Sequence, residues 1–130
     1  MLQLLKSEPP PEAPLGPEPG DATRERAEDD RAILCGACRA PIARSRDRIE
    51  VEGAHVHTFV NPSVVPYRIA CFSEAGGTVG VGEESTFWAW FKGCGWKVVV
   101  CAQCVAHVGW SFRSADRLFF GLIVDRIVEP

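Results

Sequence analysis

Residues 85–112 read STFWAWFKGCGWKVVVCAQCVAHVGWSF and stand apart from the rest of the chain in their aromatic and cysteine content. All four tryptophans of the chain lie in this segment, namely Trp88, Trp90, Trp96 and Trp110. A cysteine pair in the spacing C-x2-C, Cys101 and Cys104, stands between them. Because tryptophans precede and follow this candidate metal-binding pair, a bound metal would fix the geometry of an aromatic cluster.

A second C-x2-C pair, Cys35 and Cys38, lies far upstream. Each pair presents two sulfur atoms from one tight turn, and two pairs complete the tetrahedral thiolate shell that Zn²⁺ adopts in structural sites. The sequence therefore predicts a structural zinc bound by Cys35, Cys38, Cys101 and Cys104. Gly36 is expected to turn the first knuckle through a backbone conformation closed to other residues. His107, three residues after Cys104, could compete as a ligand, but four thiolates already suffice.

The composition is that of a globular protein, with 46% hydrophobic and 24% charged residues in a chain of 130. This length suggests one domain. A net charge of −3 offers no basic surface for nucleic acid, and no apolar run approaches the roughly 20 residues that span a membrane. Paired C-x2-C motifs favour metal binding in a reducing compartment. We expect a cytoplasmic monomer without nucleic-acid or membrane partners.

The chain divides into a leader and a folded domain. Residues 1–32 contain six of the ten prolines and eight acidic residues, which predicts a disordered, Pro-rich and acidic leader. Residues 33–130 are expected to form one mainly β domain. A glycine-rich loop is predicted at 74–84, and Pro66 argues against a central strand around it. The predicted β segments are a hairpin at 49–60 and strands at 64–71, 96–101, 110–112 and 118–128.

The tryptophans have two interpretations. They could form part of a hydrophobic core, since each buries about 150–250 Å². They could instead line a pocket for a flat ligand, because aromatic walls suit cations and planar heterocycles. The short link between Trp90 and Trp96 lets their rings converge, and Trp110 and Phe112 share one strand face. This arrangement favours the pocket.

A known family carries the same pattern of residues. The pattern comprises Ser85-Thr86, Trp90-Phe91-x-Gly93-x-x-Trp96, Cys101-x2-Cys104-x2-His107-x-Gly109-Trp110-x-Phe112, Cys35-x2-Cys38 and Asn61-Pro62. It resembles the thalidomide-binding (CULT) domain of the cereblon family, in its bacterial stand-alone form, over residues 33–128. The resemblance implies a β-tent, in which two antiparallel sheets meet at a steep angle and a four-cysteine zinc site pins them together.

The resemblance also implies a function. Such domains bind cyclic imides, such as glutarimide, succinimide and thalidomide, and related uracil-type heterocycles in a cage of three tryptophans. In eukaryotic relatives the ligand is a cyclic imide at a modified protein C-terminus. Backbone groups around Trp88 and Trp90 read the imide edge. The ligand-binding residues implied are Asn61, Pro62, Trp88, Trp90, Trp96, Trp110 and Phe112.

The chain departs from the family at three positions. Trp88 stands where the family has His, Lys92 where it has Pro, and Cys94 where it has an aromatic residue. The segment that docks eukaryotic cereblon onto its ubiquitin ligase is missing, so the resemblance does not extend to a substrate-receptor role.

A non-catalytic binding module is therefore the leading hypothesis, and two alternatives stay open. One is an enzyme like the B-type methionine sulfoxide reductases, with Cys94 as the nucleophile because no cysteine follows Cys104. The other is an interaction module that binds a peptide end through the leader or the cage.

Overall fold

The computed structural model describes residues 30–130. The predicted leader lies almost wholly outside the described residues, so it stays a prediction, as does a domain start at residue 33. One compact unit comprises Ala32–Pro130. In the part of the chain that is described, no helix has the length and apolar character needed to cross a membrane.

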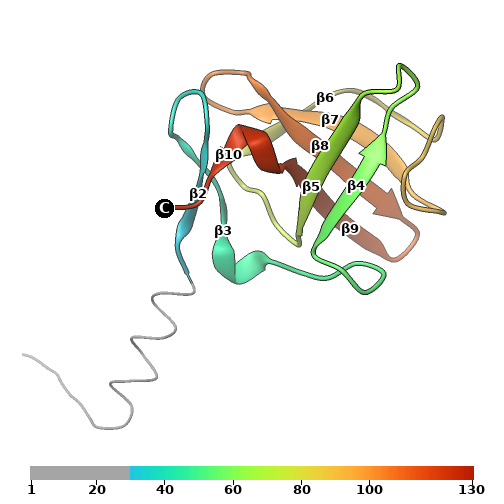
Figure 1. The fold of residues 1–130 in the computed structure, drawn as a ribbon, viewed down its shortest axis with the longest axis horizontal. Helices are drawn as coiled ribbons and strands as arrows, with labels where there is room; N and C mark the ends of the chain where they lie inside the picture. Colours follow the sequence, from blue (N-terminus) through green and yellow to red (C-terminus); the bar gives the residue numbers. More distant parts are fainter. Residues whose placement is uncertain (1–29) are drawn as a thin grey trace, which may run out of the picture. The chain divides into compact units, whose positions relative to one another are not determined.

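The unit consists of two antiparallel sheets (Figure 1). The large sheet has six strands in the order β4 (Val56–Val60), β5 (Pro66–Phe72), β9 (Arg117–Ile123), β8 (His107–Ser114), β7 (Gly95–Cys101) and β6 (Thr78–Ser85). The small sheet has the order β10 (Ile127–Val128), β2 (Ala32–Cys35) and β3 (Pro41–Arg44). Two short 3-10 turns, η1 (Ser45–Asp47) and η2 (Val124–Arg126), join strands.

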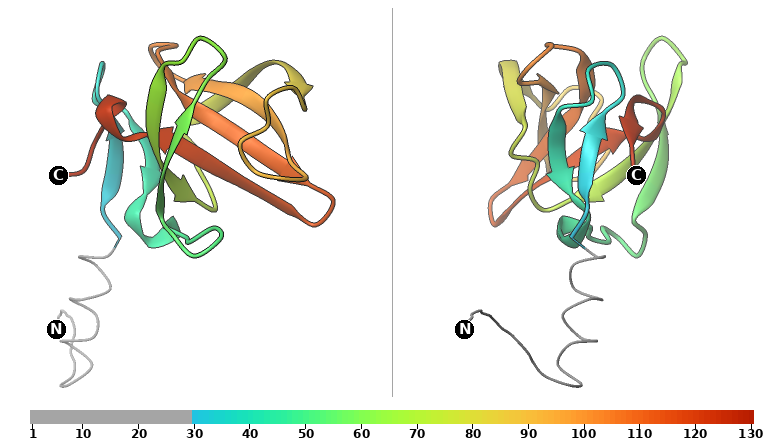
Figure 2. Two further views of the ribbon diagram at one scale, coloured as in Figure 1. Left: turned by 45° about the vertical axis from the view of Figure 1, so that its right-hand side comes forward. Right: turned by 90° about the vertical axis from the view of Figure 1, so that its left-hand side faces the viewer.

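The small sheet stands at a steep angle to the end of the large sheet (Figure 2). Every strand pairing is antiparallel. The prediction of a mainly β fold with two steeply inclined sheets is confirmed.

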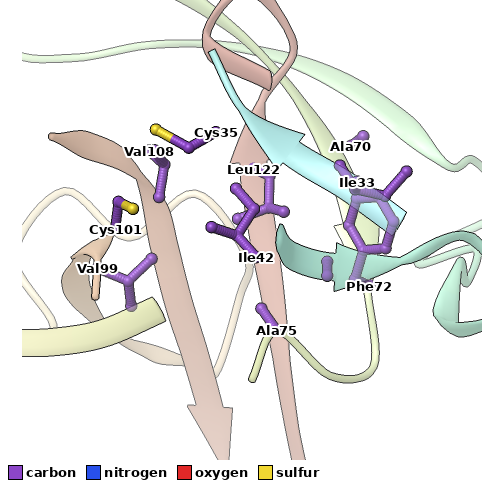
Figure 3. Packing of buried hydrophobic residues seen from close by; sticks show 11 residues of the cluster. Ile33, Cys35, Ile42, Ala70, Phe72, Ala75, Val99, Cys101, Val108 and Leu122 are labelled. Atoms are coloured by element: carbon purple, nitrogen blue, oxygen red, sulfur yellow. The ribbon is translucent and has the colours of Figure 1, made fainter. Parts of the chain in front are cut away.

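Two hydrophobic clusters hold the unit together. The first lies between the sheets, where Ile33 and Ile42 of the small sheet meet Phe72 and Leu122 of the large sheet (Figure 3). The second is aromatic and lies farther along the large sheet. There Phe91 packs edge-to-face on other buried rings, with ring centroids 4.9 Å from Phe112 and 5.1 Å from Phe119. Trp110 belongs to this second cluster, and Trp90 and Trp96 pack against it.

The predicted glycine-rich loop at 74–84 is wrong, because most of it forms the edge strand β6. Two glycines in it serve the pairing with β7. A Cβ atom at Gly80 would lie 2.8 Å from Cδ of Lys97, so glycine leaves room for the lysine side chain. Gly82 has a φ of +77° and lies at the irregularity between Val81 and Ser85. Val79 and Val81 alternate as in a strand, but the surrounding glycines are rare in strands and typical of loops, so the composition favoured a loop.

The inference that Pro66 keeps its strand from a central position is also wrong, since β5 lies between β4 and β9. Pro66 is the first residue of β5 and pairs with Val60 of β4. Pairing with β9 begins only at Ile69. The missing N–H of proline therefore interrupts no hydrogen bond toward β9.

Two other predicted segments are divided differently in the structure. The predicted strand at 118–128 comprises β9, the turn η2 and β10, and β10 belongs to the small sheet. In the predicted hairpin at 49–60, only an isolated bridge joins Val51 to Ala54, and β4 pairs with β5 instead. Alternation along the chain predicts strands but not their partners.

Substitution of Gly109 by Ala is expected to destabilise the fold by about 3 kcal/mol or more, because overpacking against rigid backbone cannot relax. An added methyl group would lie 2.1 Å from the carbonyl oxygen of Gly121, where β8 pairs with β9. Urea unfolding of the zinc-loaded protein measures the loss. Gly76→Ala is the control, since no heavy atom lies within 4 Å of its Cβ position. Equal stability of the two variants would contradict the close pairing of β8 and β9.

Candidate functional site

Four cysteine thiols meet at the junction of the two sheets. Cys35 and Cys38 come from the turn between β2 and β3, and Cys101 and Cys104 from the turn between β7 and β8. Their Sγ atoms all lie within 4.8 Å of one another. The separations are 3.7 Å from Cys35 to Cys104 and 3.6 Å from Cys38 to Cys101. A tetrahedral zinc with Zn–S bonds of 2.3 Å requires sulfur separations of about 3.8 Å, so the four thiols fit the ion.

The two knuckles have the same backbone structure, in keeping with their shared pattern C-x-x-C-x-A. In the first, Cys35 N–H donates to Ala40 O at 2.8 Å and Arg39 N–H donates to Cys35 O at 2.8 Å. In the second, the matching hydrogen bonds close a turn of the same shape, from Cys101 N–H to Ala106 O and from Val105 N–H to Cys101 O.

The positive φ of each knuckle lies after its second cysteine, at Arg39 (67°) and Val105 (62°). The role predicted for Gly36 is therefore wrong, because Gly36 has no positive φ. Glycine is required there for another reason. A Cβ atom at Gly36 would lie 3.0 Å from the carbonyl oxygen of Arg126, which accepts a hydrogen bond from Gly36 N–H at 2.9 Å.

Backbone N–H groups also donate to the sulfur atoms, as suits thiolates. Ala37 N–H donates to Cys35 Sγ and Gln103 N–H to Cys101 Sγ, both at 3.4 Å. Burial raises the pKa of Cys101, but hydrogen bonds from backbone N–H groups of Cys104 and Gln103 outweigh it and lower that pKa to about 7. At Cys38 a backbone hydrogen bond involving Ala40 lowers the pKa, but burial and the neighbouring thiols outweigh it and raise that pKa to about 12. The protein itself therefore favours the deprotonated form that zinc requires at Cys101 rather than at Cys38.

A cavity of about 310 Å³ opens beside the second knuckle. Its walls come from the loop after β4, from the 86–94 loop between β6 and β7, and from β5, β7 and β8. All seven residues predicted to bind ligand line it, together with four others that sequence reasoning did not assign to the site. The predicted seven are Asn61, Pro62, Trp88, Trp90, Trp96, Trp110 and Phe112, and the others are Tyr67, Phe87, Val98 and His107. The structure brings the seven together, and their role in binding stays a prediction.

Hydrogen bonds from the indole groups hold the 86–94 loop in place. Trp88 Nε1–H and Trp90 Nε1–H both donate to the carbonyl oxygen of Val60 at the end of β4, at 2.7 and 3.1 Å. Trp96 Nε1–H donates to Phe87 O at 2.7 Å. Three indole N–H groups thus donate hydrogen bonds within the protein. The indole rings therefore offer only their apolar faces to a ligand.

The loop after β4 is held by its own asparagine. Asn61 Oδ1 accepts hydrogen bonds from the backbone N–H groups of Ser63 at 3.0 Å and Val65 at 2.9 Å. Asn61 N–H donates to Val65 O, and Val64 N–H donates to Asn61 O. The asparagine therefore shapes the loop that carries Pro62 to the pocket.

Trp110 is the most enclosed of the four tryptophans, at 8% exposure. Three rings meet it edge-to-face, with centroid distances of 4.7 Å to Trp90, 4.8 Å to His107 and 5.1 Å to Tyr67. Such contacts are each worth about 0.5–1.5 kcal/mol beyond burial. The position of Trp110 thus depends on Tyr67 and His107.

His107 is not part of the metal cluster, which consists of cysteines among the described residues. This agrees with the prediction that four thiolates suffice, and the signal of His107 in the sequence was its place in the family pattern. Tyr67 had no such signal, because it approaches Trp110 through the pairing of β5 with β9 and of β9 with β8.

The other two cysteines are buried in the aromatic cluster. Cys71 is fully enclosed and Cys94 is 8% exposed. Burial raises the pKa of the Cys94 thiol and raises that of Cys71 to about 11. A buried, protonated thiol is a poor nucleophile, which disfavours the reductase interpretation of Cys94.

Comparison with known proteins adds two findings. The Yippee-Mis18 family, described as Yippee zinc-binding/DNA-binding and Mis18, centromere assembly, matches residues 32–125. Protein cereblon of Drosophila grimshawi is 31% identical over 65% of this chain and 13% of its own length. Protein cereblon of Drosophila erecta is 30% identical over 72% of this chain and 17% of its own length. The chain therefore matches only a small part of these relatives. With the four-cysteine cluster, the family match confirms the structural zinc.

Proposed function

Because this chain belongs to the Yippee-Mis18 family and carries a cereblon-like zinc-binding domain, we propose that its aromatic pocket is a non-catalytic binding site for cyclic imides. The observation that carries the proposal is the pocket itself. Four tryptophans line it, and no Lys, Arg, Asp or Glu is among its lining residues. Such a wall favours a flat, uncharged ring.

The size of the cavity supports a small ligand. At about 310 Å³, it lies at the lower end of the roughly 300–1,000 Å³ typical of ligand pockets. A single five- or six-membered ring fits such a space, and the rest of a larger molecule would extend into solvent through the opening of the pocket. Uracil-type rings, which carry the same imide edge, belong to the same ligand class.

Backbone groups at the mouth supply the polar contacts. A cyclic imide presents acceptor, donor and acceptor along one edge, which backbone N–H and C=O groups can match. Within residues 30–130, the backbone groups of Trp88 and Trp90 make no hydrogen bond to protein. Trp88 also has a φ of 56°, a strained conformation of the kind that clusters at ligand clamps. We therefore propose that the backbone groups of residues 88 and 90 form the hydrogen bonds to the imide edge.

The remaining proposals follow from the resemblance and from the cysteine pairs, which favour a reducing compartment. The imide is free or terminates a modified protein chain, as in the eukaryotic relatives that the resemblance names. The protein acts as a monomer in the bacterial cytoplasm. The alternatives are binding of a peptide end and sulfoxide reduction, and the burial of Cys94 disfavours the second.

Titration with glutarimide is expected to quench tryptophan fluorescence and to saturate, whereas N-methylglutarimide is expected to bind at least about tenfold more weakly. The methyl group removes the only donor of the imide edge, and one unsatisfied buried group costs about 1–3 kcal/mol. The two compounds differ only at that nitrogen and serve as a matched pair. Equal affinity for both would contradict recognition of the imide edge.

A further inference from the structure

Arg126 connects the pocket to the first zinc knuckle. It is the last residue of η2, one position beyond the region that matches the family. Its guanidinium lies near the rings of His107 and Tyr67, and both of these rings line the pocket. Arg126 itself does not line the pocket and belongs to no predicted site.

The contacts of His107 determine where its ring carries a proton. Arg126 Nη1–H donates to His107 O at 3.1 Å, and Nη1 lies 3.5 Å from Nδ1 of the same ring. Arginine has donors only, so the lone pair of Nδ1 must face it. Nε2 lies 3.0 Å from the carbonyl oxygen of Gly109, which only accepts. Both partners thus select the neutral ring with its proton on Nε2.

The positive charge of Arg126 also favours the neutral form of the His107 ring. Burial lowers the pKa of His107, the hydrogen bond to Gly109 opposes this, and the positive charge of Arg126 lowers the pKa further. A neutral His107 leaves the lining of the pocket free of charge.

The same guanidinium also packs against the second ring that supports Trp110. Its Cζ atom lies 6.0 Å from the ring centroid of Tyr67, at the limit of a cation–π contact. Tyr67 and His107 both meet Trp110 edge-to-face, at 5.1 and 4.8 Å. One side chain therefore contacts two of the three rings that enclose Trp110.

The backbone of Arg126 is fixed by the metal knuckle. Gly36 N–H, next to a zinc ligand, donates to Arg126 O at 2.9 Å. Since a side chain at Gly36 would press on this oxygen, the two segments approach as closely as glycine permits. The zinc site thereby holds η2 where its arginine can reach the pocket walls.

We propose that Arg126 is a positioning residue of the pocket, which holds His107 in its neutral Nε2–H form and, through His107 and Tyr67, orients Trp110. The proposal rests on the proposed function for its effect on ligand affinity. In this proposal, an exposed arginine outside the tryptophan cage keeps the cage uncharged and ordered.

The test compares three variants of the zinc-loaded full chain. Arg126→Met removes the guanidinium, and Arg126→Lys keeps the charge but not the planar fork. Arg117→Met is the matched control, because this exposed arginine also lies over a ring, with Cζ 5.1 Å from the centroid of Phe119, but does not line the pocket. The imidazole ¹⁵N shifts of His107 report its tautomer, and fluorescence titration reports glutarimide affinity.

Arg126→Met is expected to give His107 a mixture of tautomers and to weaken glutarimide binding about tenfold, which corresponds to 1.4 kcal/mol. Arg126→Lys should lie between it and the native protein, and Arg117→Met should match the native protein. An unchanged Nε2–H form in Arg126→Met would overturn the proposal. If the native protein binds no glutarimide, the proposed function fails, and the His107 spectra still decide the role of Arg126.

Discussion

Removal of zinc is expected to unfold the domain. The two knuckles belong to different sheets, and the four Sγ atoms within 4.8 Å of one another join β2 and β3 to β7 and β8. Zinc binding is worth about 10–16 kcal/mol in zinc-finger peptides, which is as large as the whole stability of many domains, roughly 5–15 kcal/mol. Circular dichroism during titration with a strong chelator, with the released zinc quantified, measures the effect.

Cysteine variants separate the metal from other effects of thiol loss. Cys101→Ser removes a ligand and is expected to lose both zinc and the native spectrum. Cys94→Ser alters a buried thiol outside the cluster and is expected to keep both, as well as imide binding. A native spectrum after proven loss of zinc would show that the metal is not structural. Sulfoxide turnover that depended on Cys94 would revive the enzyme alternative.

Replacement of Trp96 by Ala is expected to weaken imide binding by about 30-fold or more while the domain stays folded and zinc-loaded. Trp96 is only half-buried and forms one wall of the pocket, and its Nε1–H group holds the 86–94 loop through Phe87 O. Central aromatic residues of a binding site typically contribute about 2 kcal/mol or more. Isothermal titration calorimetry with glutarimide measures the change.

Trp110→Ala should also abolish binding, but with a loss of stability of about 3–5 kcal/mol, because this side chain is nearly enclosed. Trp88→Phe is the milder comparison, since Trp90 Nε1–H still donates to Val60 O. It is expected to weaken binding by less than about tenfold, the value of one hydrogen bond. Unchanged affinity in both alanine variants would refute the tryptophan cage.

Short-range patterns were the most informative part of the sequence. The two C-x2-C pairs identified the metal cluster because a knuckle is closed by hydrogen bonds within six residues, as between Cys35 and Ala40. The strand predicted at 96–101 agrees with β7, whose short continuous apolar run, Val98 to Cys101, is typical of an internal strand. The tryptophans of the pocket were recognisable because three of the four lie on one loop and the strand that follows it.

Predictions failed where the structural role of a residue depends on a contact with a residue distant in the chain. Nothing near Gly36 indicated that it faces Arg126, and nothing in 74–84 indicated that its glycines accommodate β7. Tyr67 reaches the pocket only because β9 lies between β5 and β8. Sequence spacing carries no information on such strand order.

The amino-acid sequence by itself determined the four-cysteine cluster, the mainly β character, and the four tryptophans and Phe112 of the pocket, because these depend on residue chemistry and on spacing within single turns and strands. Only the tertiary structure decided which ring rests on which, how His107 is protonated and that Arg126 lies beside the pocket. These features arise from strand order and from the approach of η2 to the first knuckle, where packing joins distant segments of the chain, such as Gly36 and Arg126, which are 90 positions apart.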